Sequence, residues 1–344
     1  MSQPRLYLDH AATAPLLDQA RAAMADGWAI WANPSSPHAE GRAARAALED
    51  ARARVKAALG WKGEVLFTSG ASEALALAIG HCVQPLAAVL AVEHDAVLRL
   101  AGEAQRLPVN AAGLVDPACC ALPGLVAVQQ VNSETGVVQP LDRIASAVRG
   151  SGGLLLADCA QGGGKLALPD ADLIALSAHK FGGPVGAGAL LVRELGLLKP
   201  TGGQERGYRP GTEALPLVLG MVAALEAGAR WLAEAARLRA RLEAALVASG
   251  GEIVAAVAPR LPAIGAVRMP GVASAVQLIR FDGMGLAVSA GSACSSGSLK
   301  PSHVLTAMGL DGAGEVIRVS LGRETTEADV DRFVAAWQAI AGRT

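Results

Sequence analysis

The sequence predicts an α/β protein with a mostly parallel sheet and a smaller second domain. Short apolar runs alternate with segments of helical periodicity along the N-terminal part of the chain. This alternation is typical of parallel strands joined by helices that cover both faces of a sheet. Polar residues follow several of the runs, at the carboxyl ends of strands, where such sheets bind ligands.

The expected elements of the large sheet follow from these apolar runs. Six runs are predicted to be strands: residues 64–68, 86–92, 126–131, 153–158, 173–176 and 187–192. Helices are predicted before and between them, at about residues 15–28, 38–59, 73–80, 95–106 and 144–149. A loop with two prolines at residues 33–37 separates the first two helices, because proline and small polar residues sustain neither helix nor sheet.

The turn between the first strand and its helix consists of small residues, 69–72. A strand, a short turn and a helix N-terminus place free N–H groups and the positive end of the helix dipole at one point. We therefore expect an anion site here, although Ser72 could also be an ordinary helix cap.

The C-terminal part of the chain predicts a smaller, mixed domain. A glycine-rich loop at residues 201–212 leads into one long helix at about residues 216–249. Further strands are expected at residues 252–256, 264–269, 286–290 and 316–321, with helices at 273–281, from Pro301, and after a capping Thr326.

Composition excludes several classes of function. The net charge is −1 and aromatic residues make up 3%, so the surface offers no basic field or stacking platform for nucleic acid. The N-terminus has no apolar signal core, and the longest apolar run, 214–225, is too short to cross a bilayer. We expect a cytoplasmic protein with no nucleic-acid or membrane partner.

The five cysteines predict neither a disulfide framework nor a metal site. Their number is odd, and no C-x-x-C spacing occurs. Four lie in apolar or Ala-rich surroundings and are expected to be buried: Cys82, Cys119, Cys120 and Cys159. The fifth, Cys294, differs because glycines and serines surround it.

Two of the strands end in residues that suit a pyridoxal phosphate site. Lys180 follows the run 173–176, and Asp158 ends the preceding strand. A lysine amine can form a Schiff base with an aldehyde cofactor, and an acid can pair with the pyridinium nitrogen. His94 and Asn132 also fall at predicted strand ends and belong to the same expected site.

Each candidate also has a plainer structural interpretation. Alone, Lys180 would be read as a surface lysine and Asp158 as a cap or turn residue. His94 could cap the helix after its strand, Arg318 could form an ion pair across a sheet, and Cys294 could be an inert thiol. The lysine and the aspartate on neighbouring strands together favour the cofactor site.

Ten motifs resemble those of one family, the cysteine desulfurases of the class V aminotransferase superfamily. They span nearly the whole chain in the family's order: Leu8-Asp-His-Ala-Ala-Thr13, Asn33-Pro-Ser-Ser36, Phe67-Thr-Ser-Gly-Ala-Ser-Glu73, Glu93-His94, Val131-Asn-Ser-Glu-Thr-Gly136, Asp158-Cys-Ala-Gln161, Ser177-Ala-His-Lys180, Arg209-Pro-Gly-Thr212, Gly291-Ser-Ala-Cys-Ser-Ser296 and Ile317-Arg-Val-Ser320. The form Ser-Ala-Cys-Ser-Ser resembles the group with a long mobile cysteine loop, which serves iron-sulfur cluster assembly.

The resemblance implies the fold and its division. It implies a pyridoxal phosphate enzyme of fold type I, with a mainly parallel seven-stranded sheet between helices and a smaller α+β domain. Residues 15–245 would form the large cofactor-binding domain. Residues 1–14 and 246–344 would form the small domain, which carries the cysteine loop.

The resemblance also implies cofactor contacts. Lys180 would hold pyridoxal phosphate and shuttle a proton, Asp158 would keep the ring nitrogen protonated, and His94 would stack on the ring and take part in proton transfer. Other residues would bind the ring hydroxyl, the phosphate or the substrate side of the cofactor: Gln161 the hydroxyl, Asn132 the cofactor and substrate, and Ala71, Ser72, Ser177, His179 and the neighbouring subunit's Thr212 the phosphate.

Substrate and partners are implied as well. Arg318 would bind the carboxylate of L-cysteine, and the Cys294 thiolate would attack its sulfur, which leaves a persulfide on Cys294 and releases L-alanine. The resemblance implies a homodimer with shared active sites, a sulfur-acceptor or iron-sulfur scaffold protein as partner, and no metal.

Two other hypotheses stay open at this point. A selenocysteine lyase, or another class V transferase in which Cys294 is incidental, would keep the same cofactor site. A cofactor-free interaction or scaffold protein would keep the fold alone. Absorbance of the bound cofactor and the activity of a Cys294→Ala variant separate these hypotheses.

Overall fold

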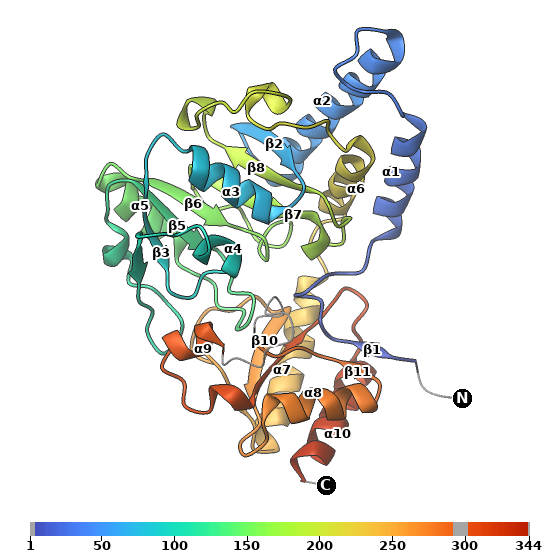
Figure 1. The fold of residues 1–344 in the computed structure, drawn as a ribbon. Helices are drawn as coiled ribbons and strands as arrows, with labels where there is room; N and C mark the ends of the chain where they lie inside the picture. Colours follow the sequence, from blue (N-terminus) through green and yellow to red (C-terminus); the bar gives the residue numbers. More distant parts are fainter. Residues whose placement is uncertain (1–3, 292–301, 343–344) are drawn as a thin grey trace.

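A seven-stranded mixed sheet forms the centre of the structure, a computed structural model that describes residues 4–291 and 302–342 (Figure 1). Its strand order is β2-β8-β7-β6-β5-β3-β4. The strands are β2 (Glu64–Thr68), β3 (Leu86–Leu90), β4 (Gln105–Leu107), β5 (Leu125–Gln129), β6 (Leu154–Asp158), β7 (Leu173–Ser177) and β8 (Gly188–Val192). The predicted α/β class and the mainly parallel seven-stranded sheet are confirmed.

The direction of the strands brings several chain segments to one edge of the sheet. β3, β4, β5, β6 and β7 run parallel, whereas β8 is antiparallel to both β7 and β2. The parallel pairing aligns Asp158 of β6 with Ala175 of β7, two residues before the end of that strand. The end of β6 and the residues after β7 are therefore neighbours in space.

Helices cover both faces of this sheet. They are α1 (Asp18–Ala29), α2 (Ala39–Leu59), α3 (Ala71–His81), α4 (Asp95–Leu98), α5 (Leu141–Gly150) and α6 (Leu215–Glu226). Alternate residues of β5 face opposite sides: Val126 packs in the core under α2, α5 and α6, while Leu125 packs in the core under α3 and α4. Both faces are dry, which explains the nearly continuous apolar runs in the sequence.

A second group of elements lies below the large sheet in Figure 1. Its strands are β1 (Leu6–Tyr7), β9 (Glu252–Ile253), β10 (Ile264–Arg268), β11 (Leu286–Ala287) and β12 (Val316–Ser320), and its helices are α7 (Leu232–Ala248), α8 (Ser274–Gly283), α9 (His303–Ala307) and α10 (Glu327–Ala341). One three-stranded sheet has the order β12-β10-β9, and β1 pairs in parallel with β11.

These elements share a core of their own. Leu6 and Leu8 from the N-terminal segment pack with Phe281, Phe333 and Trp337. Leu238, Leu242 and Leu246 of α7 belong to the same core. Arginines of α7 also pair with acids of α10, with Arg241 Nε 2.9 Å from Asp331 Oδ1. The domain boundary at residue 245 stays a prediction.

Three local predictions were wrong. The helix expected at residues 95–106 ends at Leu98, and Gln105–Leu107 instead form β4, an edge strand, after Gly102 with a φ of 46°. The long helix at 216–249 is two helices, because the chain turns through Gly228 with a φ of 66°. Cys119 is exposed at the short helix Pro117–Cys120, whereas Cys82, Cys120 and Cys159 are buried as predicted.

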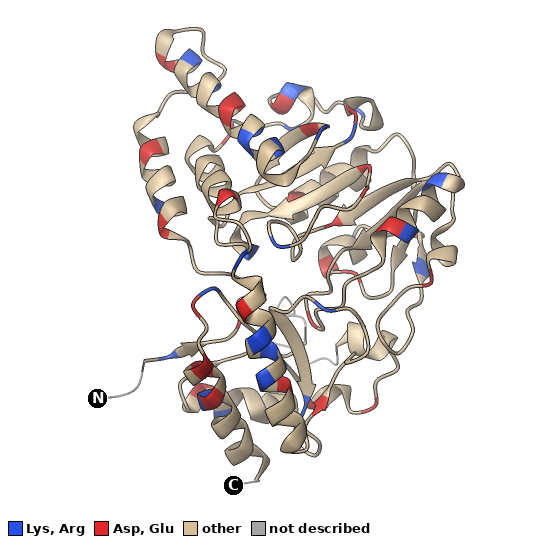
Figure 2. Cartoon of the chain, turned by 180° about the vertical axis from the view of Figure 1, so that it is seen from behind, with Lys and Arg blue, Asp and Glu red and all other residues tan. Residues whose placement is uncertain are grey.

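Charged residues are interspersed over helices and loops of both regions (Figure 2). Within residues 4–291 and 302–342, no helix is long and apolar enough to cross a membrane. In the same residues, no group of three or more His, Cys, Asp or Glu side chains is placed to hold a metal ion.

Candidate active site

A cavity of about 390 Å³ opens where β6 and β7 end and α3 begins. This volume falls within the range of small-molecule sites. Nine of the predicted site residues line it: Ala71, Ser72, His94, Asp158, Gln161, Ser177, His179, Lys180 and Arg318. The structure thus brings together residues that are spread over most of the sequence.

Lys180 reaches this cavity from a single helical turn, Ala178–Lys180, directly after β7. Its Nζ donates hydrogen bonds to the carbonyl oxygens of Ala11 and Ala12, each at 2.8 Å. The N-terminal segment therefore holds the amine at the cavity. Gly182, with a φ of 93°, and Gly183 follow and prevent the turn from continuing as a helix.

Asp158 is the last residue of β6 and is 7% exposed. Burial raises the pKa of its carboxyl group, while the N–H of Ala160, His94 and Lys180 act in the opposite direction. Its Oδ1 accepts a hydrogen bond from the Ala160 N–H at 2.9 Å. A buried carboxylate of this kind is stabilised by a neighbouring cation, which the protonated nitrogen of a pyridine ring supplies.

His94 caps α4 and lines the cavity as well. Its Nδ1 accepts the N–H of Ala96 at 3.1 Å, so the proton of the neutral ring lies on Nε2. Burial lowers the pKa of this imidazole. Lys180 acts in the same direction, and Asp158 opposes them. His94 can therefore be a helix cap and still contact a bound ring, because the cap holds its imidazole at the cavity wall.

The turn before α3 forms a cradle of backbone N–H groups. Gly70 precedes the helix with a φ of 155°, a conformation that favours glycine. A Cβ on Gly188 would lie 2.5 Å from the Gly70 Cα, so only glycine lets β8 approach this turn. The first N–H groups of α3 carry partial positive charges, so they can bind an anion at this turn.

His179 borders the same part of the cavity and is neutral at ordinary pH. Burial, Lys180 and Lys165 lower its pKa to about 4. Its Nδ1 lies 3.2 Å from Thr13 Oγ1. A neutral imidazole in this position contributes a hydrogen bond to a phosphate without adding a charge.

Gln161 leaves one buried acceptor at the cavity. Its Nε2 donates to the Ala11 carbonyl oxygen at 2.8 Å, while its Oε1 has no hydrogen-bond partner within the described residues. A ring hydroxyl would satisfy this oxygen. Together with the amine of Lys180, the buried acid and the N–H cradle, this donor set fits pyridoxal phosphate.

Arg318 lies on β12, lines the cavity and is 4% exposed. Its Nη1 donates to the Ser133 carbonyl oxygen at 2.8 Å, and its Nη2 lies 2.6 Å from Asp9 Oδ1. The sequence allowed either an ion pair or a substrate-binding arginine. The arginine forms the ion pair and also faces the cavity.

Three predicted site residues are not placed at this cavity. Asn132 uses its Oδ1 to accept from the N–H groups of Glu134 and Thr135, and its amide donates to the Val92 carbonyl oxygen. Thr212 is exposed and does not line the cavity. Cys294 lies outside the described residues. Their roles stay predictions.

The sequence did not point to three charged residues near the site. Asp9 pairs with Arg318. Glu93 has no exposed surface, and burial, with Asp158, raises its pKa well above the ordinary value. Lys165 lines a second cavity that Lys180 also borders, and burial, Lys180 and Arg323 lower its pKa to about 7. Asp9 and Glu93 do lie within two of the motifs, but no role was inferred for them, and Lys165 lies in a glycine-rich stretch.

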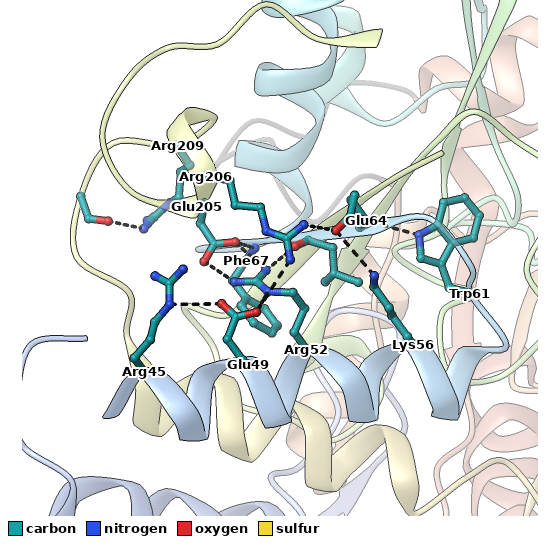
Figure 3. Close-up of polar contacts among 12 residues, drawn as sticks. Arg45, Glu49, Arg52, Lys56, Trp61, Glu64, Phe67, Glu205, Arg206 and Arg209 are labelled. Atoms are coloured by element: carbon teal, nitrogen blue, oxygen red, sulfur yellow. Dashed lines mark hydrogen bonds and ion pairs between the residues drawn. The ribbon is translucent and has the colours of Figure 1, made fainter. Parts of the chain in front are cut away.

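A buried ion pair supports the strand that leads to the N–H cradle (Figure 3). Glu205 accepts from Arg52 Nη1 at 2.9 Å, from Arg52 Nη2 at 3.1 Å and from the Phe67 N–H at 2.8 Å. Arg52 also donates to the Val65 carbonyl oxygen. These contacts tie α2 and β2 to the loop that carries Thr212.

Comparisons with known proteins identify the family of the chain. The model of the family "Aminotransferase class-V" matches residues 6–333. A cysteine desulfurase of Rhodobacter capsulatus is 35% identical over 368 residues, which cover 97% of this chain and 96% of the relative. A protein of Archaeoglobus fulgidus named cysteine desulfurase IscS 1 is 33% identical and covers 98% of this chain and 97% of the relative.

Solved structures show the same likeness. The NifS-like protein from Rickettsia africae has a TM-score of 0.89 and 28% identity, and the match covers 98% of this chain and 99% of that one. The matches over nearly the full length, and the cavity that contains the lysine and the acid, lead to one assignment. The chain belongs to the class V aminotransferases and, within them, to the cysteine desulfurases.

Proposed function

We propose that this cysteine desulfurase uses pyridoxal phosphate to convert L-cysteine to L-alanine and transfers the sulfur to Cys294. The observation that carries the proposal is that Lys180 and the buried Asp158 line one cavity beside the N–H cradle of α3. The relatives named above are cysteine desulfurases, which favours this activity over selenocysteine lyase or another class V reaction.

In this proposal the chain's own residues orient the cofactor. Asp158 binds the ring nitrogen, Gln161 Oε1 accepts from the ring hydroxyl, and His94 covers the ring face. The N–H groups at Ala71 and Ser72, with Ser177 and His179, hold the phosphate. The fixed positions of His94 and of the α3 N-terminus support these assignments.

The bound cofactor supplies a ring that accepts electrons from the substrate Cα. Lys180 holds the cofactor and moves a proton at that carbon, because its Nζ lies at the cavity between the N-terminal segment and β7. Arg318 binds the substrate carboxylate. The thiolate of Cys294 attacks the substrate sulfur, which forms the S–S bond of the persulfide while the C–S bond breaks.

We propose a homodimer in which Thr212 serves the neighbouring subunit. Two observations support it. Thr212 is exposed, away from the cavity of its own chain. Trp28 and Trp31 are 65% and 80% exposed, and large apolar side chains of this kind are enriched at interfaces. Size measurement by light scattering tests this state, and faster loss of pyridoxal phosphate from a Thr212→Ala variant during dialysis tests the residue.

The partner that we propose is a sulfur-acceptor or iron-sulfur scaffold protein in the cytoplasm. The naming of the Archaeoglobus fulgidus relative as IscS supports this pathway. Transfer of labelled sulfur from L-cysteine to purified candidate acceptors measures it directly. An acceptor that gains label from the unsubstituted enzyme and none from a Cys294→Ala variant is the expected result.

Visible absorbance and sulfide release test the central assignment. Lys180→Ala is expected to lose the absorption band of the covalently bound cofactor and the activity. Its control is Lys62→Ala, a substitution at an exposed lysine ahead of β2, which should change neither.

Cys294→Ala should keep the band and lose sulfide release from L-cysteine. The matched control is Cys119→Ala, because Cys119 is exposed to solvent and does not line the cavity. An unchanged band in Lys180→Ala would refute the cofactor assignment. Full activity of Cys294→Ala on selenocysteine would favour the lyase, and a protein that stays colourless with added cofactor would favour a scaffold role.

A further inference from the structure

Arg318 meets an acidic side chain of the same chain inside the site. Its Nη2 lies 2.6 Å from Asp9 Oδ1, and within the described residues Asp9 is the one acid that forms an ion pair with it. Arg318 is 4% exposed, so its charge is removed from bulk water. A buried guanidinium needs such a counter-ion.

Asp9 is held in place by the strand beside it. It forms a parallel bridge with Ser320, two residues beyond Arg318 on β12. The next turn is fixed as well, because the Ala11 N–H donates to Ser320 Oγ at 3.0 Å. The Tyr7 hydroxyl donates to the Asp9 carbonyl oxygen at 3.0 Å. The carboxylate therefore has a defined position relative to the arginine.

The guanidinium keeps capacity for another anion. Its Nη1 donates to the Ser133 carbonyl oxygen, and its Nε is buried without an acceptor within the described residues. Arg318 lines the cavity, whereas Asp9 does not. Glu134 also acts electrostatically on Arg318, but burial raises the pKa of this carboxyl group, and its Oε2 accepts from Ser302 Oγ at 2.5 Å.

We propose that Asp9 is the resident counter-ion of Arg318 and sets the affinity of the site for amino-acid carboxylates. This inference rests on the proposed role of Arg318 as the carboxylate-binding residue. An incoming carboxylate meets a guanidinium that is already partly neutralised and shares it with a like charge. Asp9 is thus a positioning residue, which acts on the substrate through Arg318 and holds the arginine ready between turnovers.

The test compares ligands with and without a carboxylate on the holoenzyme. L-Alanine and ethylamine differ by this group, and their binding is followed by titration of the visible absorbance. Asp9→Asn keeps the shape and one acceptor oxygen but removes the charge. We expect it to lower the dissociation constant of L-alanine about tenfold, the scale of one charge-assisted hydrogen bond, and to leave that of ethylamine unchanged.

A matched control and a second variant make the result decisive. Asp282→Asn changes an exposed acid that pairs with Arg5 in the same region, and it should alter neither constant. Asp9→Ala should unfold at lower temperature than the unsubstituted protein, and added acetate should recover its midpoint by filling the empty counter-ion position. The unfolding midpoint with and without acetate does not require activity, so this measurement still tests the inference if Asp9→Asn folds poorly.

The outcomes distinguish the role of Asp9 from the proposed carboxylate-binding role of Arg318. If Arg318→Ala weakens L-alanine but Asp9→Asn binds it no more tightly, Asp9 is a structural partner only, and the inference is overturned. If Arg318→Ala leaves L-alanine binding unchanged, the carboxylate site itself is misassigned. An equal change for ethylamine and L-alanine in Asp9→Asn would also overturn it, because ethylamine has no carboxylate.

Discussion

Replacement of Glu205 by alanine should destabilise the protein strongly although this residue lies outside the cavity. Glu205 is 1% exposed and Arg52 is 3% exposed. The substitution leaves the Arg52 guanidinium buried beside the Phe67 ring, 4.8 Å from its centroid, with Glu49, 3.2 Å from its Nε, as the remaining carboxylate partner. The Phe67 N–H loses its acceptor at the same time.

The expected loss follows from these contacts. Breaking a buried pair by removing one partner costs about 3–5 kcal/mol, and an orphaned backbone N–H costs about 1–3 kcal/mol. The two costs overlap, because one carboxylate serves both groups, and Glu49 still pairs with Arg52, so we expect a decrease of about 3 kcal/mol in the free energy of unfolding. A double replacement of Arg52 and Glu205 by leucine removes both charges and should lose less than the single variant.

Urea unfolding followed by circular dichroism measures both variants. The matched control is Glu226→Ala, which breaks a pair with Arg54 on the same helix α2, where the two side chains are 41% and 39% exposed. This loss should stay below about 1 kcal/mol. A Glu205→Ala loss as small as that of the control, or a double variant less stable than Glu205→Ala, would refute the reasoning.

Two further predictions concern Lys165 and the cap of α10. Lys165 has a pKa of about 7 in the fold against 10.5 when unfolded, so the unfolded chain binds more protons between these values and the stability of the natural protein rises with pH across this window. The full pKa difference is worth about 5 kcal/mol, but the side chain is partly exposed, so we expect Lys165→Met to be more stable by roughly 2 kcal/mol below pH 7 and to lose this advantage towards pH 10. An advantage independent of pH in thermal unfolding would contradict the shift. Thr326→Ala removes the Oγ1 that accepts from the Asp329 N–H at 3.2 Å and should cost about 1 kcal/mol in urea unfolding. Ser146→Ala, at an exposed position on α5, should cost far less, and equal losses would argue against the capping role.

The large sheet and its site residues were predictable because their signals are local. Apolar runs mark β6 and β7, and the residues at their ends must share one edge if the strands are parallel. The sequence also allowed Ser72 and His94 to be helix caps. His94 does cap α4, whereas Gly70 is the N-cap of α3 and Ser72 lies in the first turn of that helix; both residues line the cavity.

The remaining contacts depend on partners far away in the sequence. Arg52 lies between residues whose spacing predicts solvated ion pairs, and Arg45 does pair with Glu49 at the surface. Arg52 itself turns inward because Glu205, 153 residues later, supplies a buried carboxylate. The helical periodicity of the sequence around Arg52 contains no information about a partner so far along the chain. β4 was missed for a similar reason, since its three residues gain strand geometry only from pairing with β3.

The parallel pairing of β1 with β11 has a consequence for the order of events during synthesis. Asp9 leaves the ribosome early, but its partner Arg318 is 309 residues further along the chain. The large sheet, which ends at Val192, has all of its strands long before then. The nascent N-terminal segment must wait undocked until β11 and β12 emerge, so the side of the cavity that Arg318 lines is assembled last.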